Sequence, residues 1–333
     1  MQNKGLERLG LAIAGLWMGV AAAALMGITG CQQARLIQNP PSHVPGQPDQ
    51  DQQVFASDDD AAKGLLDAAK TRNRDEMRHI FGPTAVRELL SGDPVQEDRG
   101  FESFAKHASE QVRVEKETDG KSILRIGTED WPFPIPIVKA PNGKWFFDTQ
   151  AGKEEILARR VGANELATIK VCRAFVQAQR DYASKDRDGN GVLKYAQHYR
   201  STPGKKDGLY WEAAPGEEQS PAGPMVAEAA LKGYSTQKSS TGRRPYQGYY
   251  FHILTRQGPA APGGRYDYVI NGNMIAGFAL VASPAKYGSS GIMTFIISHH
   301  GKLYQKDLGP NTHEIVRQMT EYNPDSRWSL VTD

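Results

Sequence analysis

The spacing of apolar residues changes twice along this chain from a helical repeat to alternation, and this change limits the folds open to it. Between residues 57 and 110 apolar side chains recur every three or four positions, as on one face of a helix. Between residues 112 and 147 they alternate, as in a strand with one buried face. The same succession returns between residues 164 and 304. Helices followed by antiparallel strands, twice over, predict an α+β fold with two domains, residues 54–161 and 162–333.

The predicted N-terminal domain is a cone of helices on a curved antiparallel sheet. Ser57, with Asp60 three residues later, is typical of a capping box at the start of the first helix. Gly82-Pro83 is a stop signal for a shorter second helix. Two hairpins follow, with turns at Asp119-Gly120 and Asn142-Gly143. We expect the remaining helices of this domain over residues 84–91 and 101–110.

The predicted C-terminal domain is a long helix packed on an antiparallel meander. Asn164 is a suitable N-cap, and the spacing predicts a helix from there to about Ser184. A second, short helix is expected from Leu193 to Tyr199. Residues 201–244 are rich in Gly, Pro, Ser and Lys, which predicts mostly loop. The strands are expected over residues 249–253, 266–281, 293–297 and 303–304, with turns at Asn271-Gly272 and His300-Gly301.

The first thirty residues have the order of a bacterial export signal. Basic Lys4 and Arg8 precede an uncharged apolar run, and Ile28-Thr29-Gly30-Cys31 then resembles a lipobox. The resemblance implies that residues 1–30 are removed and that Cys31 is lipidated, which anchors the chain to a membrane. A transmembrane helix and a simple cleaved signal are the alternatives. Gln32 stands where aspartate is associated with inner-membrane retention, so we expect the cell envelope and the periplasmic face of the outer membrane.

The stretch after the lipobox predicts a tether, and the cysteine count predicts a buried thiol. Residues 31–53 contain four prolines and several glutamines, with little to bury. With Cys31 lipidated, Cys172 is the one remaining cysteine of the chain. It shares a helical face with Leu166, Ile169 and Val176, which favours a core thiol over a catalytic nucleophile. Two cysteines exclude a disulfide framework, and a net charge of +2 argues against a nucleic-acid partner.

The segment Asp186 to Gln197 has the spacing of a calcium loop of the EF-hand type. Such a loop takes oxygens from positions 1, 3 and 5, a backbone carbonyl at 7 and a bidentate carboxylate at 12. The tentative Ca²⁺ ligands, in that order, are Asp186, Asp188, Asn190, Val192 and Gln197. Gln197 is neutral and Lys194 adds a positive charge, which weakens the site. The alternative is an Asp/Gly turn between two helices; a calcium loop would be structural.

Other candidate sites are weaker. Trp131 and Phe133 lie in a proline-rich run that predicts either a ligand-contact platform or, more commonly, an edge strand protected by proline. Ser289 and Ser290 lack the spacing of a nucleophile elbow. The histidines have no metal-ligand spacing, and no catalytic residue is predicted.

Distinctive segments occur along nearly the whole mature chain, at residues 130–136, 179–182, 186–191, 201–205, 248–251, 262–264, 277–280 and 304–309. In these segments the chain resembles the bacterial exported domain-of-unknown-function family 2950. In layout, the N-terminal half resembles nuclear transport factor 2-like domains, and the C-terminal half resembles the heads of type IV pilins and pseudopilins. The family implies identity without an activity, and fold alone does not decide function.

These features lead to three readings of function. The first is a lipid-anchored envelope protein, a non-enzymatic module for binding or assembly with an envelope protein or glycan. The second is an envelope hydrolase or a small-ligand-binding protein with a pocket in the N-terminal cone. The third is a calcium-responsive module.

Overall fold

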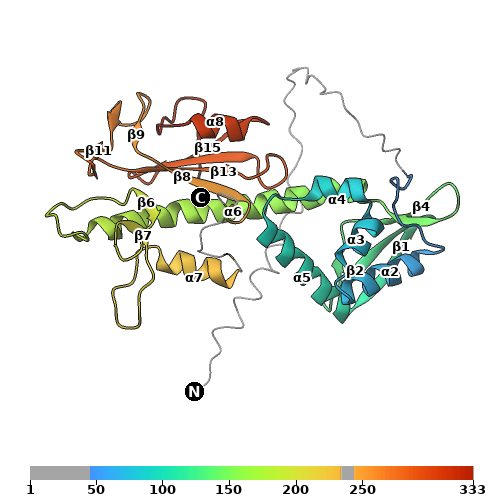
Figure 1. Ribbon diagram of the computed structural model, residues 1–333. Coiled ribbons are helices and arrows are strands. Elements are labelled where there is room, and N and C mark those ends of the chain that lie inside the picture. The colour runs from blue at the N-terminus through green and yellow to red at the C-terminus, as the bar shows by residue number, and fades with distance from the viewer. Residues whose placement is uncertain (1–45, 233, 235–243, 333) are drawn as a thin grey trace. The chain divides into compact units, whose positions relative to one another are not determined.

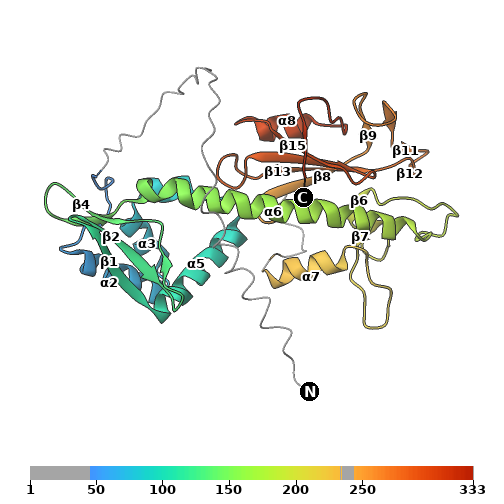
Figure 2. The same cartoon turned by 180° about the vertical axis from the view of Figure 1, so that it is seen from behind.

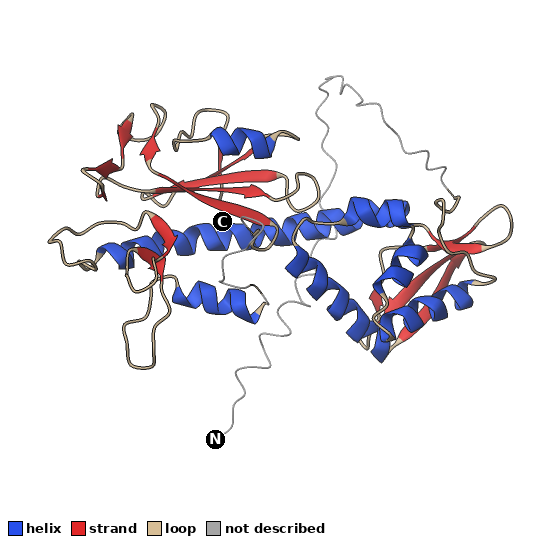
Figure 3. Ribbon diagram, in the orientation of Figure 1, coloured by secondary structure: helices blue, strands red, loops and turns tan. Residues whose placement is uncertain are grey.

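The computed structural model describes residues 46–232, 234 and 244–332 (Figure 1). The fold is α+β, as the sequence predicts, with helices and antiparallel sheets (Figure 3). Among the described residues, no helix is long and apolar enough to cross a membrane. The predicted signal, Cys31 and the first part of the predicted tether lie outside the described residues.

Four helices open the described chain, and side-chain caps start three of them. Ser57 caps the first: its Oγ accepts the Asp60 amide at 3.0 Å and donates to the Asp60 carboxylate at 2.8 Å, which confirms Ser57 as the N-cap. Asn73 and Asp93 cap two others in the same way. The four helices are α2 (Asp58–Lys70), α3 (Arg74–Phe81), α4 (Pro83–Leu89) and α5 (Pro94–Glu110).

The first sheet is antiparallel, with the order β1-β2-β4-β5 and with β3 paired to β2. The turns at Asp119-Gly120 and Asn142-Gly143 join the strands as expected, with both glycines at positive φ. Helix α2 contacts β1, β4 and β5, so it covers the inner face of this sheet. The strands are β1 (Val112–Thr118), β2 (Lys121–Ile126), β3 (Trp131–Pro132), β4 (Ile137–Lys139) and β5 (Trp145–Phe147).

The long helix α6 (Thr149–Ala183) begins fifteen residues before the predicted start (Figure 2). Its N-cap is Asp148, whose carboxylate accepts the Ala151 amide at 3.1 Å. The prediction that Asn164 caps this helix is therefore wrong: Asn164 lies inside it and is 2% exposed. The predicted boundary between the two domains falls within α6, and the division itself stays a prediction.

The second large sheet has the order β16-β15-β14-β13-β8, and α6 packs against β13, β14 and β15. The two-residue turn Asn271-Gly272 lies where the sequence places it, and His300-Gly301 lies in the connection of four residues, 299–302, between the last two long strands. The five strands are β8 (Tyr249–Leu254), β13 (Ala279–Pro284), β14 (Met293–Ser298), β15 (Leu303–Asp307) and β16 (Ser329–Leu330). Short strands and a helix complete this part: β9 (Arg256–Gln257), β10 (Tyr266–Asp267), β11 (Val269–Ile270), β12 (Asn273–Met274) and α8 (Thr312–Gln318).

The segment after α6 differs from the prediction. No helix forms over residues 193–199; the chain is extended there and enters β6 (His198–Arg200), which pairs in parallel with β7 (Gly208–Tyr210). Tyr195 forms a bridge with Met274, so tertiary pairing overrides the local helical spacing. The expected loop 201–244 also contains helix α7 (Gly223–Leu231).

The hydrophobic residues form two core clusters, one on each sheet. The N-terminal cluster includes Leu65, Leu124 and Phe147, and the C-terminal cluster includes Phe175 and Phe295.

At the middle of α6, the contacts with the rest of the fold are made by polar side chains. The Asn164 side chain donates to the Ser290 carbonyl at 2.8 Å and accepts from Gln96 Nε2 at 2.5 Å. Buried polar groups need such partners, because an unpaired one costs about 1–3 kcal/mol.

Neighbouring bonds reinforce this polar segment. Glu165 accepts the amides of Ile292 and Met293, each at 2.9 Å. Asp93, 1% exposed, accepts the Tyr234 hydroxyl at 2.6 Å and the Gly248 amide at 2.9 Å. Helices α5 and α6 are thus joined to the β13–β14 loop and to the start of β8 by buried hydrogen bonds.

Replacement of Asn164 by alanine tests this segment. The variant leaves the Ser290 carbonyl and the Gln96 amide group without their partner, so we expect the free energy of unfolding to fall by about 2 kcal/mol. Urea unfolding measures the loss. Lys170→Ala, an exposed position on the same helix, is the matched control and should change stability by less than about 0.5 kcal/mol. Equal stability of the two variants would contradict the structural role of Asn164.

Candidate functional site

A hollow of about 410 Å³ lies at the end of the first sheet where both hairpins turn. We call it the Trp145 hollow; it is lined by Lys116, Thr118, Asp119, Gly120, Ser122, Lys139, Ala140 and Trp145. The strand register explains this set. Lys116 faces Ser122, Ser122 faces Ile137, and Ile137 faces Phe147, so these four side chains share one face of the sheet. Lys139 and Trp145 form the next row outward on that face.

A buried carboxylate, which does not itself line the hollow, lies behind the lining residue Ser122. Asp58, the first residue of α2, has a side chain that is only 6% exposed. Its Oδ2 accepts the hydroxyl of Ser122, itself 1% exposed, at 2.7 Å. Its Oδ1 accepts the Asp59 amide at 3.2 Å. The Lys116 ammonium group lies 4.0 Å from Oδ2, near enough for attraction and too far for a hydrogen bond.

The wall of the hollow pairs a lysine with an aromatic ring. The Lys139 ammonium group lies 6.0 Å from the centre of the Trp145 ring, within the range of a weak cation–π contact. Backbone bonds hold Trp145 in place, since its amide donates to Phe55 at 2.9 Å and its carbonyl accepts from Phe55 at 2.8 Å. The hollow therefore combines hydrogen-bond acceptors, cations and an aromatic surface in one small space, a combination suited to recognition of a polar ligand.

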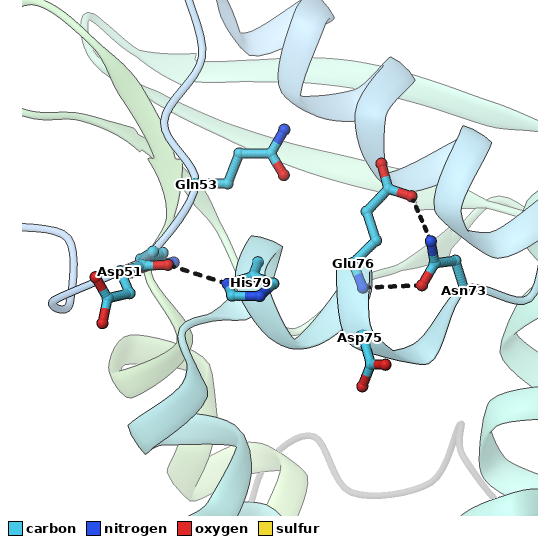
Figure 4. Close-up of a pocket in the computed structure, with 7 residues that line it drawn as sticks. Asp51, Gln53, Asn73, Asp75, Glu76 and His79 are labelled. Atoms are coloured by element: carbon cyan, nitrogen blue, oxygen red, sulfur yellow. Dashed lines mark hydrogen bonds between the residues drawn. The ribbon is translucent and has the colours of Figure 1, made fainter.

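A second hollow, of about 570 Å³ and wide open, lies beside the start of α3 (Figure 4). We call it the His79 hollow; it is lined by Asp51, Gln52, Gln53, Asn73, Asp75, Glu76 and His79. Asn73 exchanges hydrogen bonds with Glu76 as the cap of α3, at 3.1 and 3.2 Å. Asp75 pairs with Arg78 at 2.9 Å. These polar groups therefore form their hydrogen bonds and ion pair within α3 and its N-cap.

The predicted calcium loop is closed by its own hydrogen bonds. The Asp186 carboxylate accepts the amides of Gly189 at 2.9 Å and Gly191 at 2.7 Å, and the Gly191 bond is the main cause that lowers the pKa of Asp186. Asn190 accepts the Val192 amide at 3.0 Å. Asp188 is paired with the Lys194 ammonium group.

The last predicted calcium ligand points elsewhere. The Gln197 amide group donates to the Gly272 carbonyl at 2.7 Å, in the turn between β11 and β12. No group of three or more His, Cys, Asp or Glu side chains suited to a metal occurs within residues 46–232, 234 and 244–332. The calcium site stays a prediction.

Trp131 and Phe133 lie in the packing of the first sheet. Phe133 is 8% exposed and belongs to the N-terminal core, and its ring centre lies 6.2 Å from that of Trp131. Trp131 and Pro132 form the short strand β3, which pairs with β2. Their contact with a ligand stays a prediction.

The nucleophile candidates lie in the interior. Cys172 is fully buried in the C-terminal core, and burial raises the pKa of its thiol to about 12. This confirms the expected core thiol. Ser290 is also fully buried, and its hydroxyl bonds to the backbone of Lys286. Cys31, the predicted lipidation site, lies outside the described residues.

Sequence reasoning missed the Trp145 hollow, although it placed both turns that frame it. The lining residues come from four strands and the turns between them, and only the pairing of β2 with β1 and β4, and of β4 with β5, brings them together. One signal was present: Ser122 is a polar residue at a position facing the core.

The protein is thus an α+β protein with a small polar hollow on the surface of its first sheet. The chain matches the family model described as "Protein of unknown function (DUF2950)" over residues 52–331, and it belongs to that family. No curated protein and no solved structure matches the chain. The resemblances to nuclear transport factor 2-like domains and to pilin heads therefore stay predictions.

The burial of Cys172 leads to a labelling test. A chain that starts at residue 32 contains Cys172 as its single cysteine. Because burial disfavours the thiolate, we expect a thiol reagent at pH 8 to label the folded protein at least about 100-fold more slowly than the protein in urea. Mass spectrometry after timed quenching measures both rates. Similar rates in the two states would show an accessible thiol.

Proposed function

We propose that this protein is a lipid-anchored component of the bacterial cell envelope that binds a partner, a glycan or another envelope protein, without converting it chemically. The observation that carries the proposal is the order of features at the N-terminus. A basic start, an apolar run, Ile28-Thr29-Gly30-Cys31 and a proline-rich stretch precede the segment that matches the family, which begins at residue 52. The expected location is the periplasmic face of the outer membrane.

The start of the folded part agrees with a tethered arrangement. The Gln52 side chain donates to the carbonyls of Ile80 at 2.9 Å and Phe147 at 2.7 Å, and the Gln53 amide donates to His79 at 2.9 Å. The chain is therefore fastened to the body from residue 52. The predicted tether therefore has about 20 residues between Cys31 and the fastened body.

Binding is favoured over catalysis by where the reactive groups lie. The interior of the first sheet is filled by core side chains, including Leu124, Ile137 and Phe147, which argues against a deep pocket there. The described cysteine, Cys172, is buried with a raised pKa. The alternative of a small-ligand-binding protein has its support in the Trp145 hollow, outside that interior.

A calcium-responsive role is the second candidate. Its support is the compact turn that gathers the oxygens of Asp186, Asp188 and Asn190 next to two glycine amides. Lys194 competes with a cation for Asp188. The role of the ion would be structural, because Gln197 connects this segment to the β11–β12 turn.

Lipid attachment tests the proposed anchor. In bacteria that express the full chain and are fed an alkyne analogue of palmitate, we expect label on the protein and recovery in the membrane fraction. Cys31→Ala should remove both, because the acylated residue is lost. Cys172→Ala is the matched control and should keep the label. Label that survives in Cys31→Ala, or an unlabelled parent protein in the soluble fraction, would contradict the anchor.

Thermal melting tests the calcium role on residues 32–333. If the loop binds calcium, 5 mM calcium should raise the Tm by about 2 °C over the value in chelator. Lys194→Met should enlarge that rise, since it removes the competing cation. Asp186→Asn should abolish it. If calcium changes the Tm of neither the parent nor Lys194→Met, the motif is a turn that does not bind calcium.

A further inference from the structure

His299 is a titratable side chain that packs into the C-terminal core at the end of β14. It opens the connection 299–302 to β15, and its backbone amide donates to the Phe278 carbonyl at 3.0 Å. The centre of its ring lies 5.6 Å from that of Tyr268, edge to face, and 6.1 Å from that of Phe278. Both of these aromatic side chains are fully buried. The histidine therefore occupies a position where an apolar ring would be expected.

The inner nitrogen of the His299 ring has no hydrogen-bond partner. Nδ1 is buried, and no group of the described chain forms a hydrogen bond with it. It faces Gly277, where a Cβ would lie 2.6 Å from Nδ1 and 3.0 Å from the Tyr268 ring, so only glycine leaves room for both rings. The neutral ring suits this position with its proton on the other nitrogen, Nε2. Protonation of Nδ1 would place a positive charge and an unpaired N–H group in the interior.

The charged groups around His299 also oppose a positive charge there. The Arg180 guanidinium group of α6 donates to the His299 carbonyl at 3.3 Å, and the His300 ring stacks on the His299 ring with 4.1 Å between centres. Burial lowers the pKa of His299 most, and His300 and Arg180 lower it further, whereas the Phe278 carbonyl raises it. Among the described residues, no carboxylate contributes. Tyr268 adds no negative charge, because burial raises the pKa of its phenol.

We propose that His299 is an acid-sensitive switch that fastens the β14–β15 connection to the segment 268–278. Near neutral pH the uncharged ring fills the space beside Gly277 and holds residues 299–302 against the core. In acid, Nδ1 takes a proton from solvent, the charged ring leaves this space, and the connection opens together with the segment 268–278. The inference goes beyond the proposed function and does not depend on the anchor, so it is testable on a chain that has none.

The direction of the pH effect follows from the lowered pKa. A histidine in an unfolded chain has a pKa of about 6.5, and the pKa of His299 in the folded protein is lower. The unfolded or opened state therefore binds the proton more readily than the closed state. The contribution of His299 to stability is fully present above a pH of about 6.5, and it is lost as the pH falls from there through the folded-state pKa. Acid opens the connection, and base leaves it closed.

Hydrogen exchange followed by mass spectrometry on residues 32–333 is the direct test. Exchange is compared at about pH 7.5 and about pH 5, with each rate divided by the intrinsic rate of the peptide at that pH. We expect protection in peptides that cover residues 299–302 and 268–278 to fall at least about 5-fold in acid. Peptides of the β1–β2 hairpin, residues 112–126, are the internal control and should change by less than about 2-fold. Unchanged protection at residues 299–302, or an equal loss along the whole chain, would overturn the proposal.

The variant His299→Gln separates this histidine from the general effect of acid. Glutamine is polar and does not titrate, so we expect protection at residues 299–302 to differ by less than about 2-fold between the two pH values. His198→Gln is the matched control, because His198 is an exposed histidine on β6, and it should keep the response of the parent. A full acid response in His299→Gln would assign the effect to another group and contradict the proposal.

A second variant keeps the test decisive if His299→Gln does not fold. His300→Gln leaves His299 in place and removes the exposed neighbour whose charge lowers the pKa of His299. Without that charge the closed state tolerates the proton better, so we expect the acid-induced fall in protection at residues 299–302 to be smaller than in the parent. If His300 were only a packing residue, the variant would lower protection by the same factor at both pH values. That outcome would count against the switch.

Discussion

The buried hydrogen bonds at the middle of helix α6 are the interaction on which the rest of this fold depends. The helix has 35 residues and a length of about 52 Å, which is longer than one small core can cover. It therefore leaves one hydrophobic cluster before it reaches the other. Between the clusters, Asn164 forms hydrogen bonds with Gln96 and with the Ser290 carbonyl. Glu165 accepts the backbone amide of Met293, the first residue of β14. Hydrogen bonds are directional, so they fix which residues lie next to each other. Apolar contacts would allow many different pairings.

The same segment shows why local signals misplace the helix start. Asparagine is a good N-cap because its side chain accepts backbone amides, and Asn164 has that capacity. The same hydrogen-bonding capacity lets an asparagine inside a helix bind groups from distant parts of the sequence. Gln96 and Ser290 are 68 and 126 residues away, so no window around Asn164 contains them. The true cap, Asp148, follows directly on β5, where a strand ends and a helix begins without a loop.

Elements with short-range causes were predictable, and elements with long-range causes were not. The Ser57 cap and the turns at Asp119-Gly120 and Asn271-Gly272 depend on residues within four positions, and all three are confirmed. The extended segment around Tyr195 depends on Met274, and local spacing predicted a helix there. The candidate hollow has the same origin. Alternation predicts which side chains of each strand face the core, but only the register of four paired strands places Lys139 beside Trp145 and Lys116 beside Ser122.

The position of the hollow follows from a difference in extent between the sheet and its covering helix. Helix α2 begins at Asp58, while the inner face of the sheet continues outward to Lys139 and Trp145. Before the start of α2 only the segment around Phe55, which pairs with Trp145, covers that face, and Lys139 at its outer row is exposed. Side chains in that row need not be apolar for the domain to fold. Polar and aromatic residues cost little stability at this edge, yet they stand on strands held rigidly by the core beneath. At such an edge the side chains can vary without loss of the fold. Selective binding sites require side chains of this kind on a rigid backbone.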